Sequence, residues 1–146
     1  MLTMSKMLAA ASMVAVLGLT GCASTGQEPP PIKTVYHIND STNAMAAMNN
    51  IRNQLAASPT DQIVAVTHGK GIDFLLDSAT DKDGNPYSVK VDELMAQKVD
   101  FRVCNNTLTS RKIDPKTVLP GATIVPSGVA EVARLQFREG YVYLKP

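Results

Sequence analysis

Alternating blocks of apolar and polar residues predict strands separated by helices from residue 32 to residue 146. Residues 32–38 are rich in β-branched and aromatic side chains, which is typical of a strand. Residues 42–57 place apolar side chains at helical spacing, and Ser58-Pro59 ends that helix. Residues 62–67 form an almost continuous apolar run, which favours a strand covered on both faces, as in a parallel sheet.

The second half of the chain continues this alternation. In chain order, its pattern predicts a helix over residues 89–97, a strand over 99–104, a short helix over 107–112, a strand over 122–125, a helix over 127–138 and a strand over 141–144. Ser127 is the expected N-cap of the last helix, and Gly140 is its expected stop.

Strands that alternate with helices predict an α/β domain, a three-layer sandwich whose central, mostly parallel sheet has helices on both faces. In such sheets, ligands bind beyond the carboxyl ends of the strands. His37 lies near the end of the first strand, His68 follows the second, and Cys104 ends the third. We therefore expect these three side chains at one edge of the sheet.

Residues 1–22 have the pattern of an export signal that ends in a cysteine. Lys6 precedes an apolar run over residues 7–19, which is shorter than the ~20 residues that a membrane-spanning helix needs. Leu19-Thr20-Gly21-Cys22 then resembles the bacterial lipobox, in which the cysteine receives a diacylglycerol and the chain is cut before it. We predict a lipoprotein signal peptide over residues 1–21 and lipidation of Cys22. The alternative is an ordinary cleaved signal with a chance cysteine.

Processing at this point would leave an exported chain of 125 residues that is held at the membrane by acyl chains. Ala23, and no aspartate, follows the cysteine, which by Gram-negative sorting rules favours the outer membrane, facing the periplasm. Residues 22–31 include three consecutive prolines and are expected to form a stiff tether. Residues 32–146 have the length of a single domain.

Composition narrows the class of partner and site. The processed chain carries 13 basic and 13 acidic residues without a charge run, which argues against a nucleic-acid partner. The segment Asp81-Lys82-Asp83-Gly84-Asn85 has its glycine too early for an EF-hand, and His68-Gly69-Lys70-Gly71 lacks the Walker A pattern. We expect neither a metal nor a cofactor.

Cys104 is the principal candidate for chemistry. If Cys22 is acylated, Cys104 has no intramolecular disulfide partner, and a lone thiol is unusual in an oxidising compartment. Asn105 and the polar residues after it open the predicted short helix, whose N-terminus would stabilise the nucleophilic thiolate. The alternative is a buried, inert cysteine that packs as a small hydrophobe.

His68, His37 and Asn105 are candidates for supporting roles. His68 could act as a base, donate a hydrogen bond to a sulfur anion, or simply end a strand. For His37, a half-buried strand histidine is the plainer interpretation. Arg111 would face Cys104 across a regular helix and add positive charge, but a solvated surface arginine is the simpler interpretation.

Four stretches of the chain resemble the DsrE/DsrF-like family of sulfur-oxidation and sulfur-relay proteins, which share the YchN-like fold. They are residues 35–39, residues 66–71, residues 99–108 around Cys104, and segments within residues 120–143 that include Pro126-Ser127-Gly128-Val129-Ala130-Glu131. The resemblance covers almost all of residues 32–146. It implies a sheet of about five strands and a homo-oligomer, either a trimer or a hexamer.

Members of this family carry sulfur as a persulfide on a cysteine that follows a strand, and Cys104 matches that position. The resemblance therefore implies that Cys104 accepts sulfur from a sulfane donor and passes it to a partner thiol. This chain departs from the sulfur-relay members in its export signal, because those members are cytoplasmic.

Three functions stay open at this point. The first is a lipid-anchored periplasmic protein whose Cys104 carries sulfur or senses thiol redox state, as a carrier more than as a turnover enzyme. The second is a non-catalytic module that binds a small ligand near His37, His68 and Cys104. The third is an interaction protein of the envelope that works through its oligomer surface. An exposed, thiolate-like Cys104 would favour the first, and a buried, unreactive one the others.

Overall fold

The computed structural model describes residues 30–146, so the predicted signal peptide, Cys22 and most of the expected tether lie outside the described residues. The strands are β1 (Lys33–Ile38), β2 (Gln62–Thr67), β3 (Asp100–Cys104), β4 (Thr123–Val125) and β5 (Val142–Leu144). The α-helices are α1 (Ala44–Ala57), α2 (Tyr87–Ala96), α3 (Asn105–Ser110) and α4 (Gly128–Glu139). Short 3-10 helices occupy Ser41–Asn43, Gly69–Leu75 and Pro115–Thr117.

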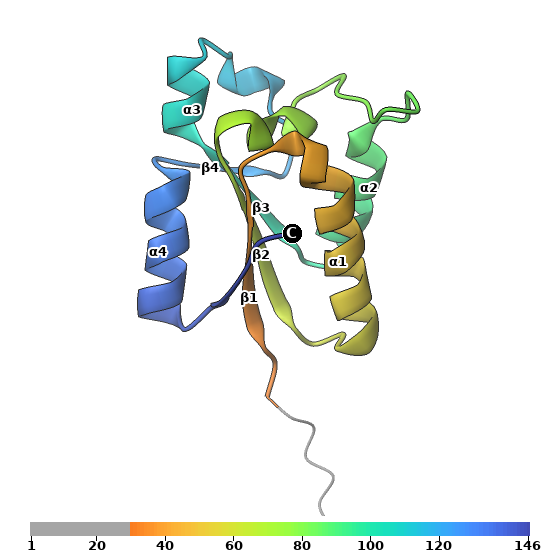
Figure 1. Ribbon diagram of the computed structural model, residues 1–146, viewed down its shortest axis with the longest axis vertical. Coiled ribbons are helices and arrows are strands. Elements are labelled where there is room, and N and C mark those ends of the chain that lie inside the picture. The colour runs from red at the N-terminus through yellow and green to blue at the C-terminus, as the bar shows by residue number, and fades with distance from the viewer. Residues whose placement is uncertain (1–29) are drawn as a thin grey trace, which may run out of the picture.

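The five strands form one sheet in the order β4-β3-β2-β1-β5, and every pair is parallel. Figure 1 shows α1 and α2 on one face of this sheet and α4 on the other. The predicted α/β sandwich with helices on both faces is therefore confirmed, and the sheet is parallel throughout. After β4, helix α4 crosses the second face and delivers β5 to the far side of β1.

The larger part of the core lies between the sheet and the helices α1 and α2. Helix α1 buries one face at helical spacing, formed by Ala44, Ala47, Met48, Ile51 and Leu55. Residues from alternate positions of the strands meet it, among them Ile63, Ala65 and Phe101. Because β2 is central and covered on both faces, its last five residues are all buried, which explains its nearly continuous apolar sequence.

Helix α4 covers the second face with a smaller cluster made of Val35, Val64, Val66, Val132 and Leu135. The Ser127 hydroxyl accepts a hydrogen bond from the Ala130 N–H at the start of this helix. Gly140 ends it with a φ of 73°, a left-handed conformation that glycine adopts without a steric penalty. Both caps agree with the prediction from the sequence.

Helices α2 and α3 begin earlier than their sequence patterns indicate, at Tyr87 and Asn105. Helix α3 starts directly after Cys104 and ends at Ser110, so that Cys104 itself is its N-cap. The segment after β2 forms a 3-10 helix from Gly69. Gly71 in this helix passes close to β1, because a Cβ on Gly71 would lie 2.0 Å from the Ile38 carbonyl oxygen. Polar residues and glycines occupy the first positions of these elements, so the spacing of apolar residues does not indicate where the elements begin.

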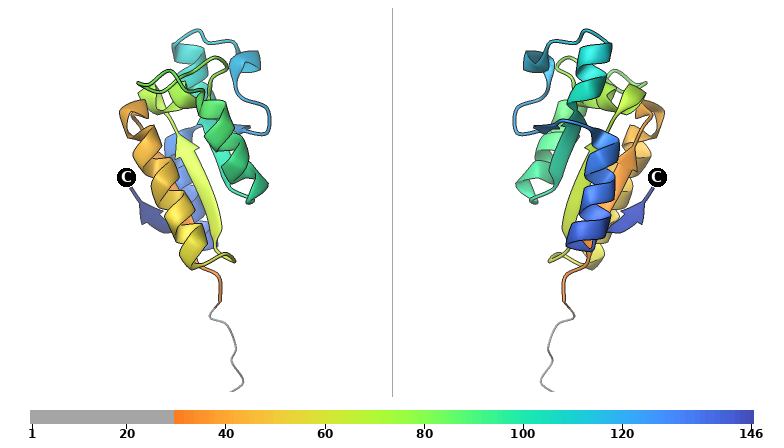
Figure 2. Two further views of the ribbon diagram at one scale, coloured as in Figure 1. Left: turned by 90° about the vertical axis from the view of Figure 1, so that its right-hand side faces the viewer. Right: turned by 90° about the vertical axis from the view of Figure 1, so that its left-hand side faces the viewer.

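The parallel arrangement gives the sheet two unlike ends. The described chain enters β1 at the amino end, and the carboxyl ends of the strands gather beside α3, at the top of Figure 1. Figure 2 shows the same arrangement from the side of α1 and α2 and from the side of α4. Within residues 30–146, no helix combines the length and the apolar character needed to cross a bilayer.

Candidate functional site

Cys104 ends β3 on the face that α4 covers, and its exposed fraction is only 4%. Its neighbour across the sheet is Val125 of β4. The thiol is free, with no disulfide partner among the described residues. The position at the carboxyl edge agrees with the prediction, and the burial is greater than an exposed nucleophile would show.

Hydrogen-bond donors gather around the buried sulfur. They are the Thr107 hydroxyl and the backbone N–H groups of Gly128, Thr107 and Asn106, of which the Asn106 N–H also donates to the Pro126 carbonyl oxygen. Burial is the largest single influence on the pKa of Cys104 and raises it, but these four donors together outweigh burial and hold the pKa below the ordinary value of 9.0. The environment of Cys104 therefore favours the thiolate.

Thr107 is oriented for this role by a bond on its other side. The Thr107 hydroxyl oxygen accepts a hydrogen bond of 3.0 Å from the Gly69 N–H, in the turn after β2. With its acceptor site occupied, the hydroxyl has its proton free for the sulfur of Cys104. The loop after β2 and the helix after β3 thus cooperate at the thiol.

Gly128 brings the first turn of α4 against the thiol. A Cβ at this position would lie 3.1 Å from the His68 Cβ, 3.1 Å from the Thr67 carbonyl oxygen and 3.2 Å from the Cys104 Cβ. Glycine fits this approach without a shift of its neighbours, and it lets the Gly128 N–H reach the sulfur.

His37 and His68 form a second polar group beside the thiol. Their Nε2 atoms lie 2.6 Å apart, and the rings stack with centroids 4.8 Å apart. Tyr143 of β5 extends the chain, because its hydroxyl lies 2.8 Å from His37 Nδ1. Burial is the main cause that lowers the pKa of both histidines. The charge of His68 lowers the pKa of His37 further, and the charge of Lys145 lowers both pKa values. Both rings are therefore neutral at pH 7.

The structure thus brings His37, His68 and Cys104 to one edge without joining them into one hydrogen-bonded unit. The His68 ring turns toward His37 on β1, which lies on the side of β2 opposite β3. Asn105 is exposed at the start of α3, and its side chain makes no hydrogen bond within residues 30–146. Arg111 binds the Gly69 carbonyl oxygen and the Asp73 carboxylate, so its charge serves the loop after β2.

Two cavities are lined by residues other than Cys104, His37 and His68. One of about 360 Å³ is lined by Pro30, Ile32 and residues 57–61, at the amino end of the sheet. Another of about 600 Å³ lies between Ser41, Met45, the turn at Asp81 and Tyr87. In that turn, the Asp81 carboxylate accepts the N–H groups of Asp83 and Asn85, as in a plain Asx turn.

Three residues that the sequence analysis did not single out complete the edge: Thr107, Gly128 and Tyr143. A glycine directly after the N-cap Ser127 is a usable signal, since a helix has no local need for glycine there. Tyr143 gives no such signal, because its place beside His37 depends on which strand β5 joins.

Comparisons with known proteins agree with this architecture. The chain is similar to a protein of unknown function, MTH1491 from Methanobacterium thermoautotrophicum, with 31% sequence identity, a TM-score of 0.70, and coverage of 79% of this chain and 99% of that chain. It shares the fold of the ychN protein from E. coli, with 15% identity, a TM-score of 0.67 and the same coverage of 79% and 99%. The comparison with curated proteins gave no match.

The sequence model of the DsrE/DsrF-like family matches residues 22–146, which include every element of the sheet and the whole edge around Cys104. The chain therefore belongs to the DsrE/DsrF-like family.

Proposed function

We propose that this protein carries sulfur as a persulfide on Cys104, at the membrane surface of the cell envelope. The observation that carries the proposal is the set of four donors around a single, nearly buried thiol. They stabilise the form of the sulfur that reacts. Membership of a family with sulfur-relay proteins supports the same chemistry.

The proposed transfer is an exchange at sulfur. The Cys104 thiolate attacks the outer sulfur of a donor persulfide, a bond forms to that sulfur, and the donor leaves as its own thiolate. Cys104 then holds the added sulfur as Cys–S–S⁻. An acceptor thiolate attacks that outer sulfur in turn and restores the Cys104 thiolate. No net oxidation or reduction of the protein occurs in the cycle.

The burial of Cys104 sets a condition on this function. A cysteine residue that is only 4% exposed reacts slowly with reagents in bulk solution, so we propose that donor and acceptor dock at the edge formed by the carboxyl ends of β2 and β3. The same burial protects a persulfide from oxidants in an exported protein. It also keeps a second function open, in which Cys104 only senses thiol redox state or forms the wall of a ligand site.

Intact mass after incubation with a sulfane donor tests this proposal. We expect the full-length chain to gain one sulfur, which a reductant removes and which Cys104→Ser does not acquire. Thr109→Val is a matched control, because Thr109 is exposed on α3 and is expected to leave the gain unchanged. No adduct on Cys104 would contradict a sulfur carrier and favour a binding or interaction module.

We further propose that Cys22 carries the lipid that attaches the protein to the outer membrane. The lipobox-like sequence before Cys22 supports this. In a bacterial host, Cys22→Ser is expected to abolish labelling by a fatty-acid probe and to release the protein from the membrane fraction. Cys104→Ser is the control and should keep both, whereas membrane retention of an unlabelled Cys22→Ser chain would contradict the proposal.

The partner of the outer face of α4 is, in this proposal, a second copy of the chain. Val129, Ala133 and Phe137 recur every four residues along that face, and Phe137 is 91% exposed. An exposed apolar stripe of this kind marks an interaction surface. A homo-oligomer, a trimer or a hexamer as the family resemblance implies, would cover it.

A further inference from the structure

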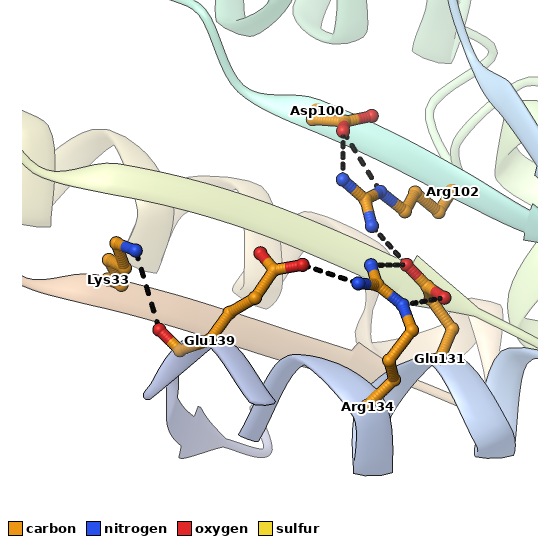
Figure 3. Close-up of polar contacts among 6 residues, drawn as sticks. All are labelled: Lys33, Asp100, Arg102, Glu131, Arg134 and Glu139. Atoms are coloured by element: carbon orange, nitrogen blue, oxygen red, sulfur yellow. Dashed lines mark hydrogen bonds and ion pairs between the residues drawn. The ribbon is translucent and has the colours of Figure 1, made fainter. Parts of the chain in front are cut away.

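Five charged residues form an ion-pair network that joins α4 to β3, as Figure 3 shows. The Arg102 guanidinium lies between Asp100 on its own strand, at 2.7 Å, and Glu131 on α4. Arg134 binds both oxygens of Glu131, at 2.7 Å and 2.9 Å, and also binds Glu139. Glu131 is therefore the residue through which the two elements are joined.

The Glu131 carboxylate is held in one place by this network. Glu131 is only 8% exposed, and a buried carboxylate needs charged partners to remain ionised. The hydrogen bonds from Arg134 are the largest cause that lowers the pKa of Glu131, and the bond and charge of Arg102 add to them against the opposing effect of burial. A charged Glu131 thus ties α4 to Arg102 at neutral pH.

The place of this ion pair relates it directly to the thiol. Arg102 precedes Cys104 by two residues on β3, so both side chains point to the face that α4 covers. Glu131 follows Gly128 by three residues, which places it about one turn along α4. The Arg102–Glu131 contact therefore lies one strand repeat and one helical turn from the contact between Cys104 and Gly128.

We propose that Glu131 is a positioning residue for Cys104: by binding Arg102, it holds the first turn of α4 at the distance from β3 that lets the Gly128 N–H face the Cys104 sulfur. The inference rests on the proposed role of the Cys104 thiolate. Gly128 has no side chain to fix this distance itself. The Asn106 N–H donates a hydrogen bond to the Pro126 carbonyl oxygen just before α4, and the apolar contacts of α4 with the sheet lie farther along the helix, at Val132 and Leu135.

A through-space effect of the Glu131 charge has the opposite sign. Removing a nearby negative charge stabilises a thiolate and would lower the pKa of Cys104. Loss of positioning withdraws the Gly128 N–H and raises that pKa. Because the two effects have opposite signs, a raised pKa of Cys104 identifies the loss of positioning.

The experiment compares Glu131→Gln with Glu139→Gln in the full-length protein. Alkylation of Cys104 is followed as a function of pH, with the modified peptide resolved by mass spectrometry. We expect Glu131→Gln to raise the pKa of Cys104 by about half a unit to one unit, which slows alkylation below that pKa about threefold to tenfold. Glu139→Gln removes an outer carboxylate from the same helix and network, and we expect a wild-type profile.

An unchanged or lowered pKa in Glu131→Gln overturns the inference. A wild-type Cys104 with an ordinary thiol pKa overturns the proposed thiolate role instead, so the two failures are distinguishable. If Glu131→Gln does not fold, Glu131→Asp serves, because it keeps the charge and shortens the reach to Arg102 by one methylene. A raised Cys104 pKa supports positioning in that variant, and a wild-type value contradicts it.

Discussion

His37 and His68 contact each other through their Nε2 atoms, 2.6 Å apart, across two neighbouring parallel strands. Such a contact needs one ring to donate and the other to accept, so it cannot survive with both rings protonated. Its neighbours are the Tyr143 hydroxyl at His37 Nδ1 and the positive charge of Lys145, which further disfavours protonation. The environment of His37 and His68 thus favours the neutral form of both rings.

We expect the pair to make stability depend on pH. Both folded-state pKa values lie below 6.5, so unfolded histidines take up protons first as the pH falls. The contribution of the pair is fully present above pH 6.5 and is lost as the pH falls from there toward the folded values. Urea unfolding of wild type and of His37→Gln between about pH 5 and pH 8 checks this. The variant should show the weaker dependence, and parallel curves would contradict the prediction.

Thr107→Val is expected to raise the pKa of Cys104, because the sulfur loses the hydroxyl that donates to it. A hydrogen bond to a charged group contributes about 1.5–3 kcal/mol, so a rise of about one pKa unit is reasonable. The pH profile of iodoacetamide alkylation measures it. Thr109→Val, an exposed site on the same helix, is the control. A wild-type profile in Thr107→Val would show that the hydroxyl does not act on the sulfur.

Two glycine substitutions are expected to destabilise the fold to different extents. In Gly71→Ala, the new Cβ would meet the Ile38 carbonyl oxygen at 2.0 Å, and backbone cannot yield easily. In Gly128→Ala, the nearest atoms lie at 3.1 Å, so a small shift of α4 suffices, at about 1–3 kcal/mol for overpacking. Thermal or urea unfolding should rank Gly71→Ala as the less stable variant. The reverse order would contradict the close approach at Gly71.

Phe137→Asp is expected to reduce the size of the proposed homo-oligomer in solution. The substitution places a charge in the apolar stripe that a second copy would cover. Light scattering coupled to size-exclusion chromatography gives the mass of the assembly. Gln136→Asp adds the same charge at the neighbouring exposed position outside the stripe and should leave the mass unchanged. An identical mass for both variants would exclude the stripe as the interface.

The order of helices and strands along the chain could be predicted from the local sequence pattern. The order of the strands in the sheet could not. The apolar run at residues 62–67 correctly indicated a strand covered on both faces, because a strand that is buried on both faces needs apolar residues at successive positions. By contrast, β5 has three exposed residues whose pattern gives no partner. The pairing of β5 with β1 depends on the crossover of α4. The contact between Tyr143 and His37 depends on the same crossover.

The same division holds at the site. Strand ends could be read from the sequence, so His37, His68 and Cys104 were expected at one edge. The contacts of each side chain could not be predicted, because the partners come from segments far apart in the chain. Gly69 orients Thr107, and Glu131 binds Arg102. The sequence left a role of His68 at the sulfur open, and the tertiary structure pairs its ring with His37.

The parallel sheet also separates the proposed membrane attachment from the proposed chemistry. The described chain enters β1 at the end of the sheet opposite Cys104, and a six-residue strand at about 3.3 Å per residue is about 20 Å long. A lipid anchor on residues that precede β1 would therefore leave the thiol edge unobstructed. A thiol protein diffusing in the surrounding solution could dock there without competing with the membrane for the same surface of the molecule.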